Sequence, residues 1–225
     1  MKTIVITGAS SGIGQETALV LTKQGFNVLG VARSEANFNR AKERILSENP
    51  NAKITFFVAD LMQQREAVRV AGEINQYLNE KCNGELYALI NNAGCVRSWY
   101  MTTEEGYEQQ FALNHLAGFL LTYKLLPALV KANGRVIMTG SQSHKGIKVR
   151  WDDVMLSRGY NPLTAYKQSK LCNMLFAKGL NDRYANKGIR AYVVDPGLVK
   201  TDIGNKDTGS LVSFIWSLRK KHGVS

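Results

Sequence analysis

Tyr166 and Lys170 are the residues of this chain whose types and spacing best suit acid–base chemistry. They lie four positions apart in a segment that predicts a helix, so both side chains share one face of it. A tyrosine titrates near pH ~10, and a neighbouring ammonium favours the phenolate. At ~4 Å and an effective dielectric of ~20 the attraction is ~4 kcal/mol, enough in principle for about three pKa units. Tyr166 is therefore a candidate acid or base near neutral pH, although such a pair is common by chance.

Polar residues at the ends of two predicted strands support this pair. Ser141 follows one strand, and Asn91-Asn92-Ala93-Gly94 ends another. In a parallel sheet ligands bind at the carboxyl ends of the strands, so the Ser141 hydroxyl can hold a carbonyl oxygen beside Tyr166. Ser143 is a nearby competitor for this role, and the Asn–Gly segment also suits a plain turn.

Asn114 lies inside an apolar segment, FALNHLAGFLL, that predicts a helix. A buried asparagine costs stability unless its amide is hydrogen-bonded. Its side chain therefore either binds backbone or water locally, or anchors a chain of water molecules that leads to Lys170.

A glycine-rich turn follows the first predicted strand. It reads Thr7-Gly8-Ala9-Ser10-Ser11-Gly12-Ile13-Gly14 and opens a helix. Glycine permits a tight turn and lets the backbone approach a pyrophosphate, while the helix N-terminus offers N–H groups and a positive dipole to phosphates. The spacing is GxxxGxG rather than GxGxxG, and a plain Gly–Ser turn is the alternative. Its place between strand and helix favours dinucleotide binding.

The end of the second predicted strand bears on the choice of cofactor. An acidic residue there would accept a hydrogen bond from a ribose 2′-hydroxyl. This strand ends in Arg33 and has no acid before Glu35, which favours the 2′-phosphate of NADP(H) over NAD(H). Asp60 and Leu61, after the third strand, fall where an adenine edge would lie, but Asp60 could equally be a helix N-cap.

Strands and helices alternate along the whole chain. The expected strands are 3–6, 27–32, 53–59, 86–90, 135–139 and 189–194, and the expected helices are 12–25, 35–47, 63–79, 107–131 and 164–186. Short apolar strands between amphipathic helices predict a parallel sheet covered on both faces. We expect one α/β domain over 1–225, a doubly wound Rossmann-type sheet in which a C-terminal strand is missing.

Composition narrows the class of protein. The net charge is +11, but the basic residues are scattered and no nucleic-acid-binding module is present, so no nucleic-acid partner is expected. Three cysteines, none in a CxxC pair or at metal-ligand spacing to a histidine, indicate free thiols and no metal site. No signal peptide and no uninterrupted apolar run of ~18 residues is visible. A cytoplasmic protein is therefore expected.

Taken together, these motifs resemble the short-chain dehydrogenase/reductase family from about Lys2 to Thr201. The matching pieces, in order, are TGASSGIG, NNAG, Asn114, Ser141, YKQSK and Asp195-Pro196-Gly197 with Thr201. The 25-residue step from Ser141 to Tyr166, with NHLAGFLLT and YKQSKLCNMLF, is similar to the retinol dehydrogenase and protochlorophyllide reductase branch. That branch handles bulky lipophilic substrates with NADP(H).

The resemblance implies site residues. It implies a catalytic tetrad of Asn114, Ser141, Tyr166 and Lys170, in which Lys170 also holds the nicotinamide ribose, and a nicotinamide lined by 196–201. The expected cofactor-binding set is Thr7, Gly8, Ser10, Ser11, Gly12, Ile13, Gly14, Arg33, Asp60, Leu61, Asn91, Ala93, Gly94, Tyr166, Lys170, Pro196, Gly197, Val199 and Thr201.

The C-terminal segment departs from the resemblance. Relatives close their sheet with a further helix and strand, and membrane-associated ones carry an N-terminal anchor. Here 202–225 is expected to be a substrate-loop segment, whose apolar residues between Leu211 and Leu218 share a helical face. That face either covers a lipophilic substrate or packs as core. Arg219-Lys220-Lys221 would add at most a weak contact with anionic lipid, and a homo-oligomer stays open.

The expected activity is a reversible hydride transfer between NADP(H) and a small-molecule carbonyl or alcohol. In the reductive direction Tyr166 donates the proton, Ser141 orients the oxygen, Lys170 tunes Tyr166, and Asn114 supports proton relay. Two rival classes are a dinucleotide sensor without turnover and an epimerase or dehydratase on the same fold. Turnover of any carbonyl would exclude the sensor. Net consumption of NADPH would exclude the epimerase or dehydratase.

Overall fold

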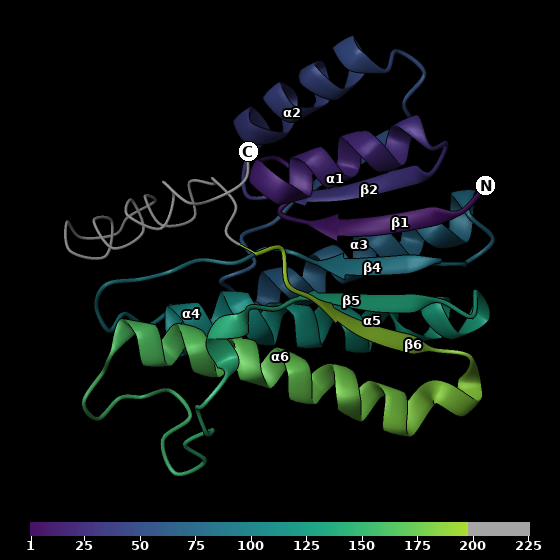
Figure 1. The fold of residues 1–225 in the computed structure, drawn as a ribbon. Helices are drawn as coiled ribbons and strands as arrows, with labels where there is room; N and C mark the ends of the chain where they lie inside the picture. The colour runs from purple at the N-terminus through teal and green to yellow at the C-terminus, as the bar shows by residue number, and fades with distance from the viewer. Residues whose placement is uncertain (198–225) are drawn as a thin grey trace.

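The computed structural model describes residues 1–197, and these form one six-stranded sheet in which every strand pair is parallel (Figure 1). The strands are β1 (Thr3–Thr7), β2 (Asn27–Ala32), β3 (Ile54–Val58), β4 (Ala88–Asn91), β5 (Arg135–Thr139) and β6 (Arg190–Val194). Their order is β3-β2-β1-β4-β5-β6. The chain reverses its winding between β1 and β4, and such a switch point is where open α/β sheets bind ligands. The predicted doubly wound sheet is confirmed.

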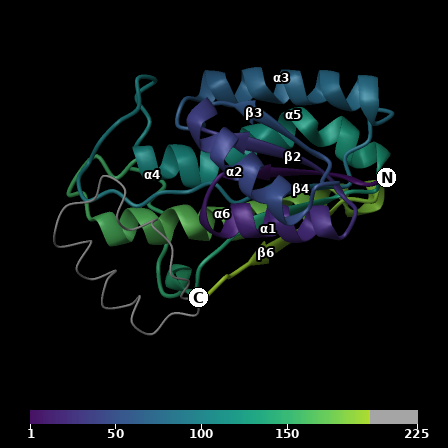
Figure 2. The same ribbon diagram turned by 90° about the horizontal axis from the view of Figure 1, so that it is seen from above.

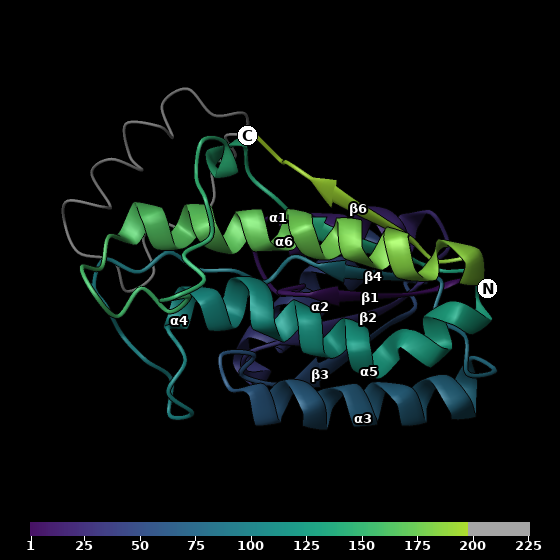
Figure 3. The ribbon, with the colours of Figure 1, turned by 90° about the horizontal axis from the view of Figure 1, so that it is seen from below.

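Helices cover both faces of the sheet. They are α1 (Gly12–Lys23), α2 (Glu35–Glu48), α3 (Gln64–Lys81), α4 (Gln109–Phe111), α5 (Ala117–Lys131) and α6 (Pro162–Tyr184), with a π-helical turn η1 (Ala112–Leu116) and 3₁₀ turns η2 (Gln142–His144) and η3 (Ala185–Lys187). Buried residues of α1 and α2 join strand residues in one core cluster, and those of α3, α5 and α6 join strand residues in a second, while Val96 and Tyr166 form a small third one. Figure 2 shows α1 and α3 on opposite sides of the sheet, and Figure 3 shows α6, α5 and α3 side by side.

Two predicted helices differ in detail from the expectation. The helix expected over 107–131 is broken into α4, η1 and α5, so Asn114 lies on a π-helical turn, a feature frequent at functional sites. It begins at Gln109 because the Glu108 carboxylate caps the backbone N–H groups of Gln110 and Phe111. The last helix begins at Pro162, before the expected Thr164, because Asn161 caps its first turn.

One helical run among the described residues, Gln109–Lys131, is long and apolar enough to cross a membrane by length and composition. The expectation of no such run considered only uninterrupted apolar residues, whereas the mean hydropathy of this one reaches 1.3. Its buried leucines, including Leu121, Leu125 and Leu129, belong to the core cluster beneath the sheet. Packed core helices pass the same test, so the run is weak support for a membrane span.

Candidate active site

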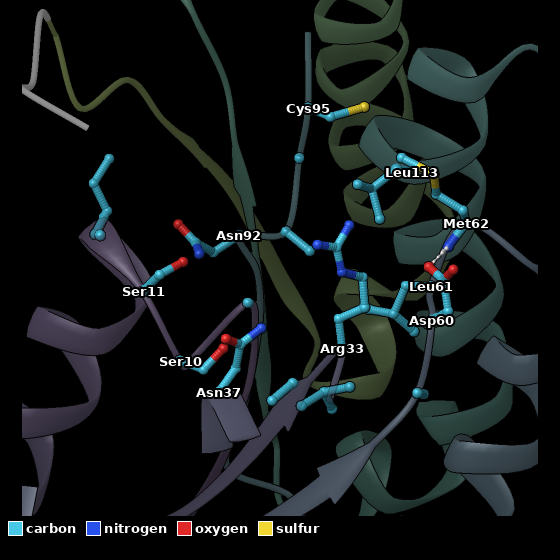
Figure 4. A pocket seen from close by; sticks show the side chains of 18 of the residues that line it. Ser10, Ser11, Arg33, Asn37, Asp60, Leu61, Met62, Asn92, Cys95 and Leu113 are labelled. Carbon is cyan, nitrogen blue, oxygen red and sulfur yellow. Dashed lines mark hydrogen bonds between the residues drawn. The ribbon is translucent and has the colours of Figure 1, made fainter. Parts of the chain in front are cut away.

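A cleft of about 310 Å³ opens where β1, β2, β3 and β4 end (Figure 4). Figure 4 shows Arg33 in the middle of it, between the serines of the glycine turn and the Asp60–Met62 segment. The residues that line it are Gly8, Ser10, Ser11, Gly12, Ile13, Val31, Ala32, Arg33, Asn37, Ala59, Asp60, Leu61, Met62, Asn92, Ala93, Gly94, Cys95, Arg97 and Leu113. The sequence-predicted cofactor residues of β1–β4 therefore gather here, with the exceptions described below.

Glycine is required at three positions of the turn that forms one wall of the cleft. Gly8 and Gly12 have φ values of +68° and +54°, in the left-handed region that disfavours other residues. A Cβ on Gly14 would lie 2.3 Å from the Gly8 carbonyl oxygen. The turn can therefore fold tightly against the first turn of α1 only with this spacing of glycines.

Thr7 lies behind the cleft and joins β1 to β4. Its Oγ1 accepts hydrogen bonds from the backbone N–H groups of Asn92 and Ala93, both at 2.9 Å. The Asn92 side chain donates in return to the Thr7 carbonyl oxygen at 3.1 Å. Thr7 thus positions the two cleft walls relative to each other. Asn92, which belongs to the predicted Asn–Gly segment but not to the predicted cofactor-binding set, completes this link.

Asn91, in contrast, does not reach the cleft. Its amide nitrogen contacts Thr122 Oγ1 and Met138 Sδ, each at 3.2 Å, inside the core beneath α5. Alternation along β4 explains this, because neighbouring residues of a strand point to opposite faces. Asn92, the next residue, lines the cleft in its place.

The hydrogen bonds of Asp60 decide between its two predicted roles, adenine contact and helix N-cap. The Asp60 carboxylate accepts from the backbone N–H of Met62 at 3.1 Å, whereas α3 has Gln63 at its N-cap position. The first N–H groups of α3 are instead capped by Glu105, which accepts from Arg65 N at 2.9 Å. The N-cap reading of Asp60 is therefore wrong, and its side chain lies in the cleft wall. Asn37, four residues after Arg33 in the first turn of α2, also lines the cleft.

Tyr166 and Lys170 lie buried on α6, with the Lys170 ammonium 5.5 Å from the centroid of the Tyr166 ring. Lys170 Nζ donates to the carbonyl oxygen of Thr139, at the end of β5, at 2.9 Å. Burial lowers the pKa of Lys170 to about 8, while the nearby Cys95 and Asp195 raise it. Since Cys95 lines the cleft and lies near Lys170, the pair lies next to this cleft rather than apart from it.

Ser141 lies two residues after the end of β5 and directly precedes η2. Its Oγ donates to Ser143 Oγ at 3.0 Å and accepts from the backbone N–H of Ser143 at 3.2 Å. The Ser141 carbonyl oxygen is 2.6 Å from His144 Nδ1. The two serine hydroxyls therefore contact each other. The hydrogen bond from the Ser143 backbone N–H, within the η2 turn, fixes the orientation of the Ser141 hydroxyl.

Asn114 ties two segments of the site together. Its Oδ1 accepts from the backbone N–H of Cys95 at 2.7 Å, and its Nδ2 donates to Cys95 O at 3.0 Å and Ser169 Oγ at 3.1 Å. Its own carbonyl oxygen accepts from Asn173 Nδ2 at 2.9 Å. The side chain therefore binds the backbone of Cys95, which is one of the two alternatives considered for it, and joins the cleft wall to α6. The proposed water chain to Lys170 remains a prediction.

The turn after β6 reaches the same region. The Asp195 carboxylate accepts from Gln142 N at 3.1 Å and from Gly197 N at 3.0 Å, and Gly197 has a φ of +71°. Pro196 and Gly197 thus lie beside the Ser141 turn. Val199, Thr201 and the predicted substrate-loop segment 202–225 lie outside the described residues. Within 1–197, no three His, Cys, Asp or Glu side chains converge as a metal site would require.

Five cleft side chains were not named from the sequence: Asn37, Met62, Cys95, Arg97 and Leu113. Met62 and Cys95 directly follow segments that were singled out, so their position was a usable signal. Arg97 carries no such signal, because the loop after Gly94 has no predicted structure that would place it. Leu113 lies in the predicted helix beside Asn114, but an apolar residue there suits the core equally well.

A doubly wound sheet with a glycine turn at its switch point, and a Tyr–Lys pair on the helix after β5, defines a dinucleotide-binding oxidoreductase. The family model for short chain dehydrogenases matches residues 2–210, and the chain belongs to this family. It is 36% identical over 218 residues to retinol dehydrogenase 12 of Mus musculus, covering 96% of this chain and 67% of that protein. It is 36% identical to retinol dehydrogenase 13 of Homo sapiens over 205 residues, 90% of this chain and 60% of that protein.

A solved structure shares the fold. The short-chain dehydrogenase from Sphingobium yanoikuyae in complex with NADPH matches with a TM-score of 0.74 and 26% identity, over 92% of this chain and 75% of the other. These findings place the chain in the retinol dehydrogenase-like branch of dehydrogenases and reductases. The chain spans about 60–67% of the length of the two retinol dehydrogenases.

Proposed function

We propose that this chain transfers hydride between NADP(H) and a carbonyl or alcohol carbon, with Tyr166 as the acid–base group. The observation that carries the proposal is the buried Tyr166–Lys170 pair, on a helix that packs against the η2 turn after Ser141 and near Cys95 of a cleft with a glycine-turn wall. A sensor without turnover would need the cleft but not a buried ammonium beside a tyrosine. An epimerase or dehydratase would consume no net NADPH.

The residues of the cleft fit a dinucleotide. The Gly8–Gly14 approach leaves no room for a side chain, and the N-terminus of α1 offers backbone N–H groups to phosphate. Gly8, Ser10, Ser11, Gly12 and Ile13 would hold the pyrophosphate side. Asp60 and Leu61 would border the adenine, with Ala93 and Gly94 along the ribose. When bound, the nicotinamide supplies or accepts the hydride.

The chain's own residues would manage the proton and the oxygen. Tyr166 donates a proton to the carbonyl oxygen in the reductive direction, and Ser141 donates a hydrogen bond that orients the same oxygen. Lys170, held by Thr139 O, keeps a positive charge near the phenol and favours its anionic form after proton loss. Asn114 holds Cys95 against Ser169, which keeps the cleft wall and α6 in register.

Arg33 supports NADP(H) over NAD(H). It follows β2 directly and projects into the cleft (Figure 4). It stands where an NAD(H)-binding protein would have an acidic residue for the ribose 2′-hydroxyl. A guanidinium suits a 2′-phosphate because it donates several hydrogen bonds in a fixed plane. Asn37, close to it in the first turn of α2, would add a neutral donor.

A lipophilic substrate is the class we favour, since similar proteins are named retinol dehydrogenase and one, from Homo sapiens, polyprenol dehydrogenase at 32% identity. We further propose a cytoplasmic location, at most a weak peripheral contact with membranes, and leave a homo-oligomer open. Fractionation of cells and light scattering would check these.

The proposed function is tested by Tyr166→Phe, with Tyr192→Phe as the control. Tyr192 lies 51% exposed on β6, away from the cleft. Oxidation of NADPH is followed at 340 nm across aldehydes, ketones and quinones, and binding is followed by cofactor fluorescence. Tyr166→Phe should abolish nearly all turnover and leave NADPH binding intact, because the phenol carries only the proton. If it keeps more than about a tenth of the wild-type kcat, a loss below ~1.4 kcal/mol, the acid–base role is wrong.

A further inference from the structure

Glu108, Gln110 and Tyr160 form a hydrogen-bonded cluster, called the joint below, where α4 and α6 begin. Figures 1 and 3 show α4 against the first turns of α6. Glu108 immediately precedes α4, six residues before Asn114, and Tyr160 lies six residues before Tyr166. The Tyr160 hydroxyl donates to Glu108 Oε1 at 3.0 Å. The contact therefore joins the starts of the two segments that carry Asn114, Tyr166 and Lys170, three of the four proposed tetrad residues.

Glu108 is 2% exposed, and hydrogen bonds compensate the burial of its carboxylate. Besides the Tyr160 hydroxyl, it accepts from the backbone N–H groups of Gln110 at 3.0 Å and Phe111 at 2.7 Å. Burial raises the pKa of Glu108, whereas these hydrogen bonds and the nearby Arg97 lower it. A buried carboxylate that only capped a helix would not need a tyrosine from a distant loop.

Gln110 extends the joint to a third segment. Its Nε2 donates to the Tyr160 hydroxyl at 2.7 Å, to Pro162 O at 3.2 Å and to Arg97 O at 3.5 Å. Pro162 is the first residue of α6, and Arg97 belongs to the cleft wall. The Tyr160 ring also packs edge-on against Tyr100, 5.5 Å between centroids.

We propose that Glu108 and Tyr160 are positioning residues, which set the orientation of Tyr166 relative to Asn114 through the start of α6. This inference rests on the proposed function. Without the hydroxyl of Tyr160, the 25-residue segment between Ser141 and Tyr166 loses a buried attachment just before α6, and the phenol of Tyr166 samples unproductive orientations. Displacement of a reacting group by a fraction of an ångström is enough to slow chemistry.

The test compares Tyr160→Phe, Glu108→Gln and the double variant, with Tyr192→Phe as the matched control for loss of a phenol hydroxyl. Tyr160→Phe keeps the ring and its contact with Tyr100. We expect kcat to fall about tenfold, about 1.4 kcal/mol, with KM and the Kd of NADPH within twofold of wild type. The double variant should lose no more than the worse single variant, because both remove one interaction.

Hydrogen exchange gives a readout that does not depend on turnover. Tyr160→Phe should speed amide exchange together in peptides covering 108–116 and 160–170, while Tyr192→Phe leaves both unchanged. If Tyr160→Phe keeps kcat within twofold of wild type, or leaves exchange in both peptides unchanged, the positioning role is overturned. If the wild-type protein turns over no carbonyl, the proposed function is wrong. The hydrogen-exchange comparison then tests only whether Tyr160 holds the two segments together. If Glu108→Gln fails to fold, Tyr160→Phe against its control carries the test.

Discussion

Replacing Lys170 by methionine should change how the stability of this protein depends on pH. The ammonium is buried beneath Tyr166 and donates to Thr139 O, and burial lowers its pKa from 10.5 to about 8. In the unfolded chain the same group is hydrated and keeps its proton to about pH 10.5. Between these two values the unfolded state binds more protons than the folded state, so the free energy of unfolding rises with pH.

The magnitude follows from the two pKa values. A pKa lowered from 10.5 to about 8 costs the folded protein about 3 kcal/mol at pH 7, since one pKa unit corresponds to about 1.4 kcal/mol. At pH 9.5 most of this cost has gone, and about 1.4 kcal/mol remains. The wild type should therefore gain about 2 kcal/mol over Lys170→Met between pH 7 and pH 9.5. The lost hydrogen bond to Thr139 adds a constant that cancels in this comparison.

The assay is urea unfolding of cofactor-free wild type and Lys170→Met at pH 7 and pH 9.5, followed by circular dichroism. Other groups titrate in both proteins, so their contributions cancel in the difference. Replacement of the exposed Lys81 by methionine is the control, and its difference from wild type should be the same at both pH values. A Lys170→Met difference that does not change with pH would refute the argument that burial depresses this ammonium's pKa.

Two further predictions concern the cleft. Arg33→Ala should weaken NADPH binding roughly 10–150-fold, as expected for a charge-assisted contact of about 1.5–3 kcal/mol, and barely change NADH binding; equal weakening of both in a fluorescence titration would mean a structural arginine. Gly14→Ala should raise the Kd of NADPH at least tenfold, because its Cβ would lie 2.3 Å from Gly8 O. The matched control is Gly72→Ala in α3, where a Cβ meets nothing within 4 Å and thermal unfolding should show a gain of about 0.5–1 kcal/mol.

The fold was predictable because its signals are local. Six apolar runs separated by five helical patterns are enough to specify a parallel sheet, and all six strands form within two residues of the expected ends. The glycine turn was predictable for the same reason, since Gly8, Gly12 and Gly14 meet requirements set within one turn. Such requirements depend on backbone geometry alone, which spacing in the sequence reveals.

Contacts between distant segments were not predictable in this way. The side chain of Asn114 binds Cys95 and Ser169, residues 19 and 55 positions away, and nothing near Asn114 marks either partner. The capping of α3 by Glu105, 40 positions from Arg65, replaced an equally plausible local cap by Asp60. In both cases a side chain competes for a backbone group that only the folded arrangement brings within reach.

The buried groups of the site divide into two kinds with different energetic roles. Thr7 and Asn114 each accept from backbone N–H groups of another segment, and Glu108 accepts from the Tyr160 hydroxyl as well as from the helix that it caps. Their burial is therefore compensated by hydrogen bonds and contributes to the shape of the site. Lys170 has a single carbonyl partner within the described chain and a depressed pKa, so it costs stability where it lies. At a position that only supported the fold, an apolar side chain of similar length would give a more stable protein. An ammonium at this cost, beside the one buried tyrosine of α6, is what the acid–base role of Tyr166 would require. Tyr166→Phe and Lys170→Met should therefore both remove activity but differ in their effect on stability. The first should change stability little, and the second should relieve a cost of burial at neutral pH.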